Sequence, residues 1–270
     1  MQPNCFDLNK NSQIVLIGSG NVASHLGKVL VAKGYTITQV WSRTAVNAIS
    51  LAGQINSTAI ADLSLVNKSA DFYIISVADD AIPVIVGSLP QISGIVVHTS
   101  GSQSIEVLNR FQQHGVLYPL QTFSKSREVD FNEIPLCLEA SDSEILDNIQ
   151  KLALTISPNI HYLNSVQRRY AHLAAVFANN FSNYMQVISS DILQSNQIDK
   201  NLLKPLIEES FNKLCSMDAW EAQTGPAKRL DTELISKHLD LLKPFPQFYK
   251  IYQTVSESIV DRANINQQTN

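Results

Sequence analysis

A glycine-rich segment near the amino end has residue types and a spacing that could do chemistry. The run Gln13–Ile17 leads directly into Gly18-Ser19-Gly20-Asn21-Val22-Ala23, which has the pattern GxGxxA. The first glycine of such a pattern permits a tight turn, the second lets backbone approach a pyrophosphate, and the alanine lets a helix pack on the strand. The same spacing also suits a plain strand–helix turn. We expect a dinucleotide site that includes Gly18, Ser19, Gly20, Asn21 and Val22.

A second polar stretch bears on which dinucleotide would bind. An NAD site usually places an acidic residue about 20 positions after the glycines. No acidic residue occurs here between Gly20 and Asp62. The next expected strand, 36–41, is followed directly by Ser42-Arg43-Thr44. A guanidinium flanked by two hydroxyls suits a 2′-phosphate, although a solvated loop arginine would look the same. The sequence therefore favours NADP over NAD.

Polar residues also follow three later apolar runs. The carboxyl ends of parallel strands border the ligand crevice of an α/β sheet. The expected cofactor contacts there are Val77, Ala78, Asp79, Thr99 and Ser100. Ser100 and Gln121 are also candidate substrate contacts. The hydroxyls of residues 99–102 would serve equally well as a helix cap.

A polar stripe lies on a long apolar helical pattern between residues 166 and 193. At about 100° per residue, His172 and Asn179 fall within roughly 40° of each other. They either satisfy hydrogen bonds between helices or face the crevice, where His172 would move a proton near neutral pH. The candidate catalytic residues are His172 and Asn179. Asn180 and Thr224 are candidate substrate contacts, although Thr224 also fits a plain Gly-Pro loop.

The elements that must position these residues fall into two parts. Up to residue 163, short β-branched runs alternate with helical patterns, which predicts an α/β Rossmann-type parallel sheet. The expected strands are 13–17, 36–41, 72–77, 95–98, 116–120 and 136–139. Only helical patterns follow, and the expected helices are 166–193, 204–217, 231–242 and 247–262. We expect residues 1–163 to bind the cofactor and residues 164–270 to form an all-α substrate and dimerisation domain.

Composition argues against several classes of function. The net charge is −4, which disfavours binding to a nucleic-acid backbone. No apolar run approaches the roughly 20 residues that cross a membrane, and the polar first dozen residues do not look like a secretory signal. The three cysteines lack CxxC spacing and the six histidines are scattered, so no metal site is expected. A cytoplasmic protein is expected.

Motifs along nearly the whole chain resemble one bacterial family. In order they are GSGNVASHL, DFYIISVADDAI, VVHTSGS, GVLYPLQTFS, HLAAVFANNF and TGPAKRLD. The family is one of NADP oxidoreductases with a Rossmann-like domain followed by a helical domain of unknown function. It is more distantly similar to pyrroline-5-carboxylate reductase and β-hydroxyacid dehydrogenases. The resemblance implies a second domain like the carboxyl-terminal domain of 6-phosphogluconate dehydrogenase, and a homodimer formed through it.

One position departs from the β-hydroxyacid dehydrogenase pattern. Those enzymes carry a catalytic lysine three residues before an Asn-Asn pair. This chain has Asn179-Asn180, but Val176 stands at the lysine position. We expect an NADP-dependent oxidoreductase that moves a hydride between nicotinamide and a small carbonyl, imine or alcohol substrate. The missing lysine keeps open a non-catalytic NADP-binding regulatory or scaffold protein.

Overall fold

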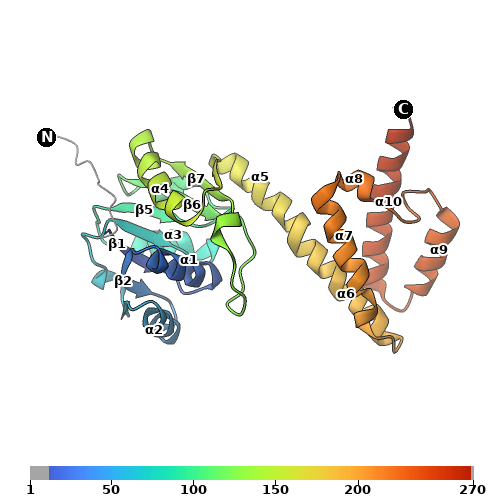
Figure 1. Cartoon of the computed structure of the whole chain (residues 1–270), viewed down its shortest axis with the longest axis horizontal. Coiled ribbons are helices and arrows are strands. Elements are labelled where there is room, and N and C mark those ends of the chain that lie inside the picture. The colour runs from blue at the N-terminus through green and yellow to red at the C-terminus, as the bar shows by residue number, and fades with distance from the viewer. Residues whose placement is uncertain (1–11, 269–270) are drawn as a thin grey trace. The chain divides into compact units, whose positions relative to one another are not determined.

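The computed structural model describes residues 12–268. The chain divides into two compact units between Asn180 and Phe181, and Figure 1 shows the elements of each. The first unit therefore includes the start of the long helix, with His172. The functional division at residue 163 stays a prediction, and the expectation for the polar residues 1–11 lies outside the described residues. None of the described helices has the length and apolar character needed to cross a membrane.

The first unit is built on one eight-stranded sheet with the order β3-β2-β1-β4-β5-β6-β7-β8. The strands are β1 Gln13–Ile17, β2 Thr36–Trp41, β3 Thr58–Ile60, β4 Phe72–Ile75, β5 Ile95–His98, β6 His114–Pro119, β7 Leu136–Ala140 and β8 Ile160–Tyr162. All six predicted strands are present. The sequence did not predict β3 and β8, because each has three residues and is too short to show a hydrophobic period.

The expected parallel pairing holds from β3 to β6 and is wrong for β7, which pairs antiparallel with β6. A parallel neighbour needs a crossover connection, usually a helix. The chain between Pro119 and Leu136 holds only the short 3-10 turn Phe131–Glu133. Without a crossover helix, the chain returns beside β6 in the opposite direction.

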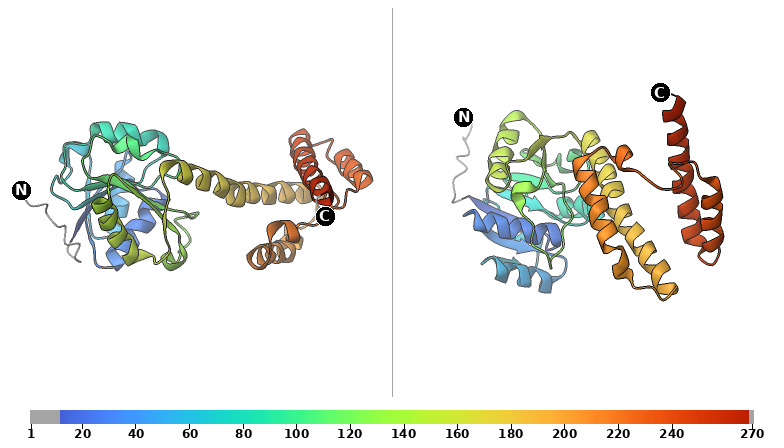
Figure 2. Two further views of the ribbon diagram at one scale, coloured as in Figure 1. Left: turned by 90° about the horizontal axis from the view of Figure 1, so that it is seen from above. Right: turned by 45° about the vertical axis from the view of Figure 1, so that its right-hand side comes forward.

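Helices cover both faces of this sheet (Figure 2). On one face, α1 (Asn21–Ala32), α2 (Ala45–Gln54) and α4 (Ser143–Ile156) contribute to the same buried cluster as Ile14 and Leu16. On the other face, α3 (Ile82–Ser88) packs with Val15 and Ile17. The two-sided covering explains why the central strands β1, β4 and β5 are nearly continuous apolar runs rather than alternating ones.

The long helix predicted for residues 166–193 is confirmed but is not uniform. It comprises α5 (Ser165–Ala175), a π-helical turn over Val176–Phe181, and α6 (Ser182–Ser195). A capping box between Asn164 and Gln167 begins α5. Because a π-turn has i→i+5 bonds, the 100° spacing used to align His172 with Asn179 does not hold across it.

The remaining helices lie in the second unit. They are α7 (Lys204–Ser216), α8 (Ala219–Ala222), α9 (Thr232–Leu241) and α10 (Pro246–Gln268). Three of them match predicted helices, and α10 continues six residues beyond the predicted end at Arg262. The single turn α8 is capped by Asp218 and is too short to show a period.

Candidate active site

The two glycines of the GxGxxA segment meet different surroundings. Gly18 has φ of 130°, and a Cβ placed on it would lie 2.0 Å from the carbonyl oxygen of Ser76. Gly20 stands at the N-cap of α1, where a Cβ would have no atom within 4 Å. The fold therefore requires Gly18, while Gly20 keeps the space in front of the helix open.

The amino end of α1 lacks a side-chain cap. Gly20 supplies none, and the first turn holds no acidic residue. By contrast, the Asp142 side chain accepts a 2.9 Å hydrogen bond from Ile145 N at the start of α4. The first N–H groups of a helix have no partner within the helix and carry a positive partial charge. The start of α1 can therefore bind an anion.

Ser42, Arg43 and Thr44 lie beside this turn. The hydroxyl of Ser19 donates to that of Ser42 over 2.7 Å and so joins the ends of β1 and β2. Arg43 is exposed and forms no ion pair in the described part of the chain. Thr44 is the N-cap of α2, but its side chain makes no capping bond. A guanidinium, a hydroxyl and an uncapped helix end are thus available together.

The ends of β4 and β5 are joined by side chains. Thr99 Oγ1 donates to Ser76 Oγ over 3.1 Å, and Ser102 Oγ donates to the carboxylate of Asp79. Val77 and Ala78 lie in the link that leads from β4 to Asp79. These contacts bring the predicted cofactor residues of both segments to one edge of the sheet.

Ser100 shapes the loop after β5. Its hydroxyl oxygen accepts hydrogen bonds from the backbone N–H groups of Ser102, at 3.1 Å, and Gln103, at 3.0 Å. The hydroxyl therefore acts as a turn cap, the structural role that the sequence left open for this cluster. Its buried position at the strand end keeps it beside the predicted cofactor residues.

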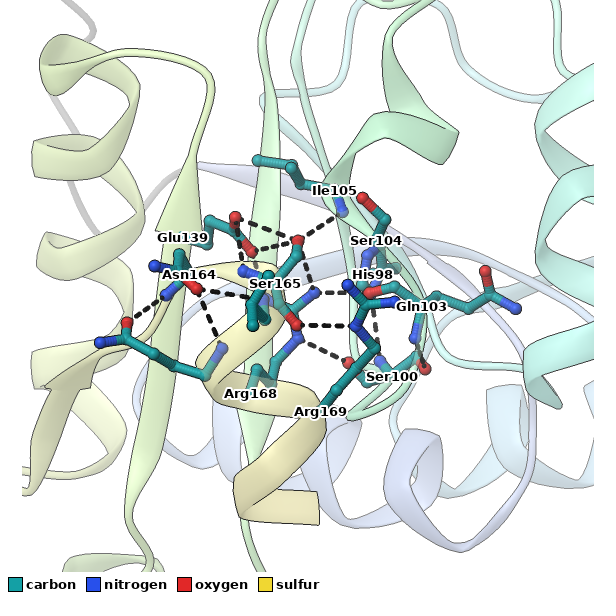
Figure 3. A network of polar contacts seen from close by, with 12 residues as sticks. His98, Ser100, Gln103, Ser104, Ile105, Glu139, Asn164, Ser165, Arg168 and Arg169 are labelled. Atoms are coloured by element: carbon teal, nitrogen blue, oxygen red, sulfur yellow. Dashed lines mark hydrogen bonds and ion pairs between the residues drawn. The ribbon is translucent and has the colours of Figure 1, made fainter. Parts of the chain in front are cut away.

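A buried arginine, Arg168, holds α5 to this loop (Figure 3). Arg168 is 0% exposed. Its Nε donates to the Ser100 carbonyl over 3.2 Å and its Nη2 to the Gln103 carbonyl over 2.5 Å. Its Nη1 pairs with the carboxylate of Glu139 on β7, which also accepts from the backbone and hydroxyl of Ser165. No local pattern marks this cluster, because its members come from separate segments.

His172 lies one helical turn after Arg168 and meets Tyr118 of β6. Its Nδ1 is 3.1 Å from the Tyr118 hydroxyl. A Cβ on Gly101 would lie 2.7 Å from that nitrogen, so glycine is needed for the rings to sit here. The imidazole is half-buried. The sequence singled out His172 but not Tyr118, which shows no signal beyond its place at a strand end.

The other candidates are more dispersed. Asn21 Nδ2 donates to the Phe123 carbonyl over 2.7 Å, and the Gln121 side chain accepts from Thr122 N. Asn179 and Asn180 are exposed in the π-turn, and Thr224 is exposed in the second unit. The described contacts do not bring Gln121, Asn179, Asn180 or Thr224 to His172. Within residues 12–268, no three His, Cys, Asp or Glu side chains are grouped as a metal site would require.

His98, at the end of β5, should make stability depend on pH. Burial and the neighbouring Arg168 charge lower its pKa from 6.5 to about 4. Between these values the unfolded chain binds a proton that the folded chain does not. The free energy of unfolding therefore falls as the pH is lowered from about 6.5 to about 4. The slope approaches about 1.4 kcal/mol per pH unit and the total about 3 kcal/mol.

The measurement is urea unfolding at several pH values, compared between the natural protein and His98→Asn. The variant should lose the part of this pH dependence that comes from His98 and keep the part that comes from the other titratable groups. Identical pH dependence in the two proteins would contradict the assignment to His98.

Comparisons with known proteins match both halves of the chain. A Rossmann-like domain model matches residues 3–123, and a model of a domain of unknown function, DUF2520, matches residues 134–259. The crystal structure of a putative NADP oxidoreductase from Bacteroides fragilis is 38% identical, with a TM-score of 0.86, over 93% of this chain and 99% of that one. The chain belongs to the family of this protein. Among curated proteins, none matches the chain.

Two solved structures that are much less similar in sequence share the fold. An imine reductase from Myxococcus stipitatus in complex with NADP+ is 14% identical, with a TM-score of 0.61, over 96% of this chain and 95% of its own. A 1-pyrroline-5-carboxylate reductase from Streptococcus pyogenes is 12% identical, with a TM-score of 0.60, over 94% of this chain and 99% of its own. The family therefore has the architecture of these reductases.

Proposed function

We propose that this chain is an NADP-dependent oxidoreductase that moves a hydride between nicotinamide and a small carbonyl, imine or alcohol substrate. The observation that carries the proposal is the uncapped start of α1 next to the available Arg43. The hydrogen bond between Ser19 and Ser42 holds the two features together. The NADP oxidoreductase in the same family supports the same cofactor.

The residues present fit this dinucleotide at three places. Residues Gly18–Val22 and the start of α1 receive the pyrophosphate, because Gly20 leaves open space in front of an uncapped helix. Ser42, Arg43 and Thr44 hold the 2′-phosphate. Residues Val77–Asp79 and Thr99–Ser100, at the ends of β4 and β5, border the nicotinamide end. NADPH, when bound, supplies the hydride, and the chain supplies orientation and a proton.

His172 is the proposed proton donor and acceptor. Hydride addition to a carbonyl or imine leaves an electron pair on oxygen or nitrogen that needs a proton. An imidazole can give that proton near neutral pH. Its Nε2 has no hydrogen-bond partner within residues 12–268, while Nδ1 is engaged by Tyr118. Asn179 is the proposed second contact to the reacting atom, and Ser100, Gln121, Asn180 and Thr224 are proposed substrate contacts.

The proposed assembly is a homodimer formed through the helical part of the chain. Large apolar side chains are exposed along its helices, including Tyr170, which is 70% exposed, and Phe177, at 62%. In the second unit, Leu202 and Leu206 around the start of α7 are exposed as well. Extended exposed apolar surface usually marks an interface. A cytoplasmic location stays a proposal from the sequence.

The cofactor assignment is tested at Arg43. Replacing Arg43 with Ala should lower NADPH affinity by about 10- to 100-fold, since a hydrogen bond to a charged group is worth about 1.5–3 kcal/mol. NADH affinity should hardly change, because NADH lacks the 2′-phosphate. Calorimetric titration of both dinucleotides measures this.

Arg43→Lys provides a graded comparison, since it keeps the charge and loses the bidentate geometry. Arg169→Ala removes another exposed arginine and should leave both affinities unchanged. Equal losses for NADPH and NADH in Arg43→Ala, or no loss for either, would contradict the 2′-phosphate assignment.

A further inference from the structure

The aromatic ring of Tyr118 meets the imidazole of His172 edge-on. The ring planes are inclined at 71° with centroids 6.1 Å apart, and the hydroxyl lies 3.1 Å from Nδ1. Tyr118 as a whole residue is only 9% exposed, and its contact with His172 is partly buried. The contact therefore fixes one nitrogen of a half-buried histidine from inside the first unit.

Two neighbouring residues hold the pair in place. Gly101 packs against both rings, and a Cβ there would be 2.7 Å from His172 Nδ1 and 2.8 Å from Tyr118 Cζ. On α5, Arg168 binds the carbonyls of Ser100 and Gln103, on both sides of Gly101. Residues four apart share a helix face, so the bonds of Arg168 also place His172 over the glycine.

Burial leaves Tyr118 as a neutral phenol. Burial, followed by Cys137 and Asp79, raises the pKa of Tyr118 to about 12, and Arg168 acts in the opposite direction. A neutral phenol can accept a hydrogen bond through its oxygen and donate one through its proton. It can therefore stay bonded to Nδ1 whether or not that nitrogen carries a proton.

We propose that Tyr118 is a positioning residue for His172, whose Nδ1–H it binds when the imidazole is protonated, leaving Nε2–H as the proton given to substrate. The inference rests on the proposed role of His172. In the reduction, the hydride supplies the electron pair of the new C–H bond, and the carbonyl or imine π pair moves onto oxygen or nitrogen. That atom takes the Nε2 proton, so one N–H bond breaks and one O–H or N–H bond forms. The ring is left neutral with Nδ1–H still bound to Tyr118, and a proton from water restores Nε2–H.

The test is the Nδ1–H signal of His172 in protein labelled with ¹⁵N-histidine. Natural protein should show a His172 Nδ1–H proton protected from exchange with water, because the Tyr118 hydroxyl binds it. Tyr118→Phe should lose that protection. Gly101→Ala should lose it too although Tyr118 is retained, because the added Cβ separates the rings.

Unchanged His98 and His114 ring signals provide the check that both variants keep the fold around β5 and β6. Protection that persists in Tyr118→Phe, or that is absent from natural protein, would overturn the inference. The signal needs neither substrate nor cofactor, so its outcome is separate from that of the proposed function. A His172→Asn variant with full turnover would refute the catalytic role and leave the hydrogen bond to Tyr118 in place.

Discussion

Replacing His172 with Asn is expected to lower turnover by about 10²–10⁴-fold, the usual effect of removing a general acid. Asparagine keeps a polar group on α5 but cannot move a proton near neutral pH. NADPH affinity should stay unchanged, since the proposed cofactor contacts come from the turns after β1, β2, β4 and β5. The measurement is the rate of NADPH oxidation with the best substrate found, together with an NADPH titration.

His161→Asn is the matched control. His161 is an exposed histidine on β8 whose Nε2 contacts Asn159, so its replacement should leave turnover and cofactor affinity unchanged. Natural turnover and an unchanged pH profile in His172→Asn would leave this histidine as a packing residue. The proton donor would then have to be sought at Ser100 or Gln121.

Replacing Glu139 with Ala is expected to destabilise the first unit by about 3–5 kcal/mol, because it leaves a buried charge without its partner. The guanidinium of Arg168 is 0% exposed, and Glu139 is its only ion-pair partner among the described residues. The same change removes the acceptor for Ser165 at the start of α5. Urea unfolding measures the loss.

Glu233→Ala is the control for this substitution. Glu233 pairs with Lys237 on the surface of α9, where both side chains are mostly exposed, and such pairs contribute little to stability. A loss in Glu139→Ala no larger than that of Glu233→Ala would contradict the importance of the buried pair. Weaker anchoring of α5 in Glu139→Ala should also reduce the protection of His172 Nδ1–H.

The sequence predicts the part of the site that depends on local spacing. The turn at Gly18 and the hydroxyls beside Arg43 each follow a predicted strand, and in an α/β sheet such strand ends meet at one edge. The long helix, predicted from residue 166, begins at Ser165, because a helical period is also a local signal.

Contacts between distant segments could not be predicted in this way. Tyr118 and His172 are 54 positions apart, and Arg168 and Glu139 are 29 apart, so no period or motif links them. The π-turn at Val176–Phe181 likewise leaves no mark in an apolar helical pattern, yet it changes which residues share a face with His172. The direction of β7 depends on the absence of a crossover helix after Pro119.

The most direct test of an NADP-dependent oxidoreductase is a screen of NADPH oxidation by the natural protein. Small keto acids, aldehydes and imines are offered in turn, and the decrease in NADPH is followed beside the same mixtures with NADH and with His172→Asn. We expect one substrate class to oxidise NADPH, with slower turnover for NADH and much slower turnover for the variant. Tight binding of NADPH with no turnover across all three classes would contradict this function and favour a non-catalytic NADP-binding regulatory protein.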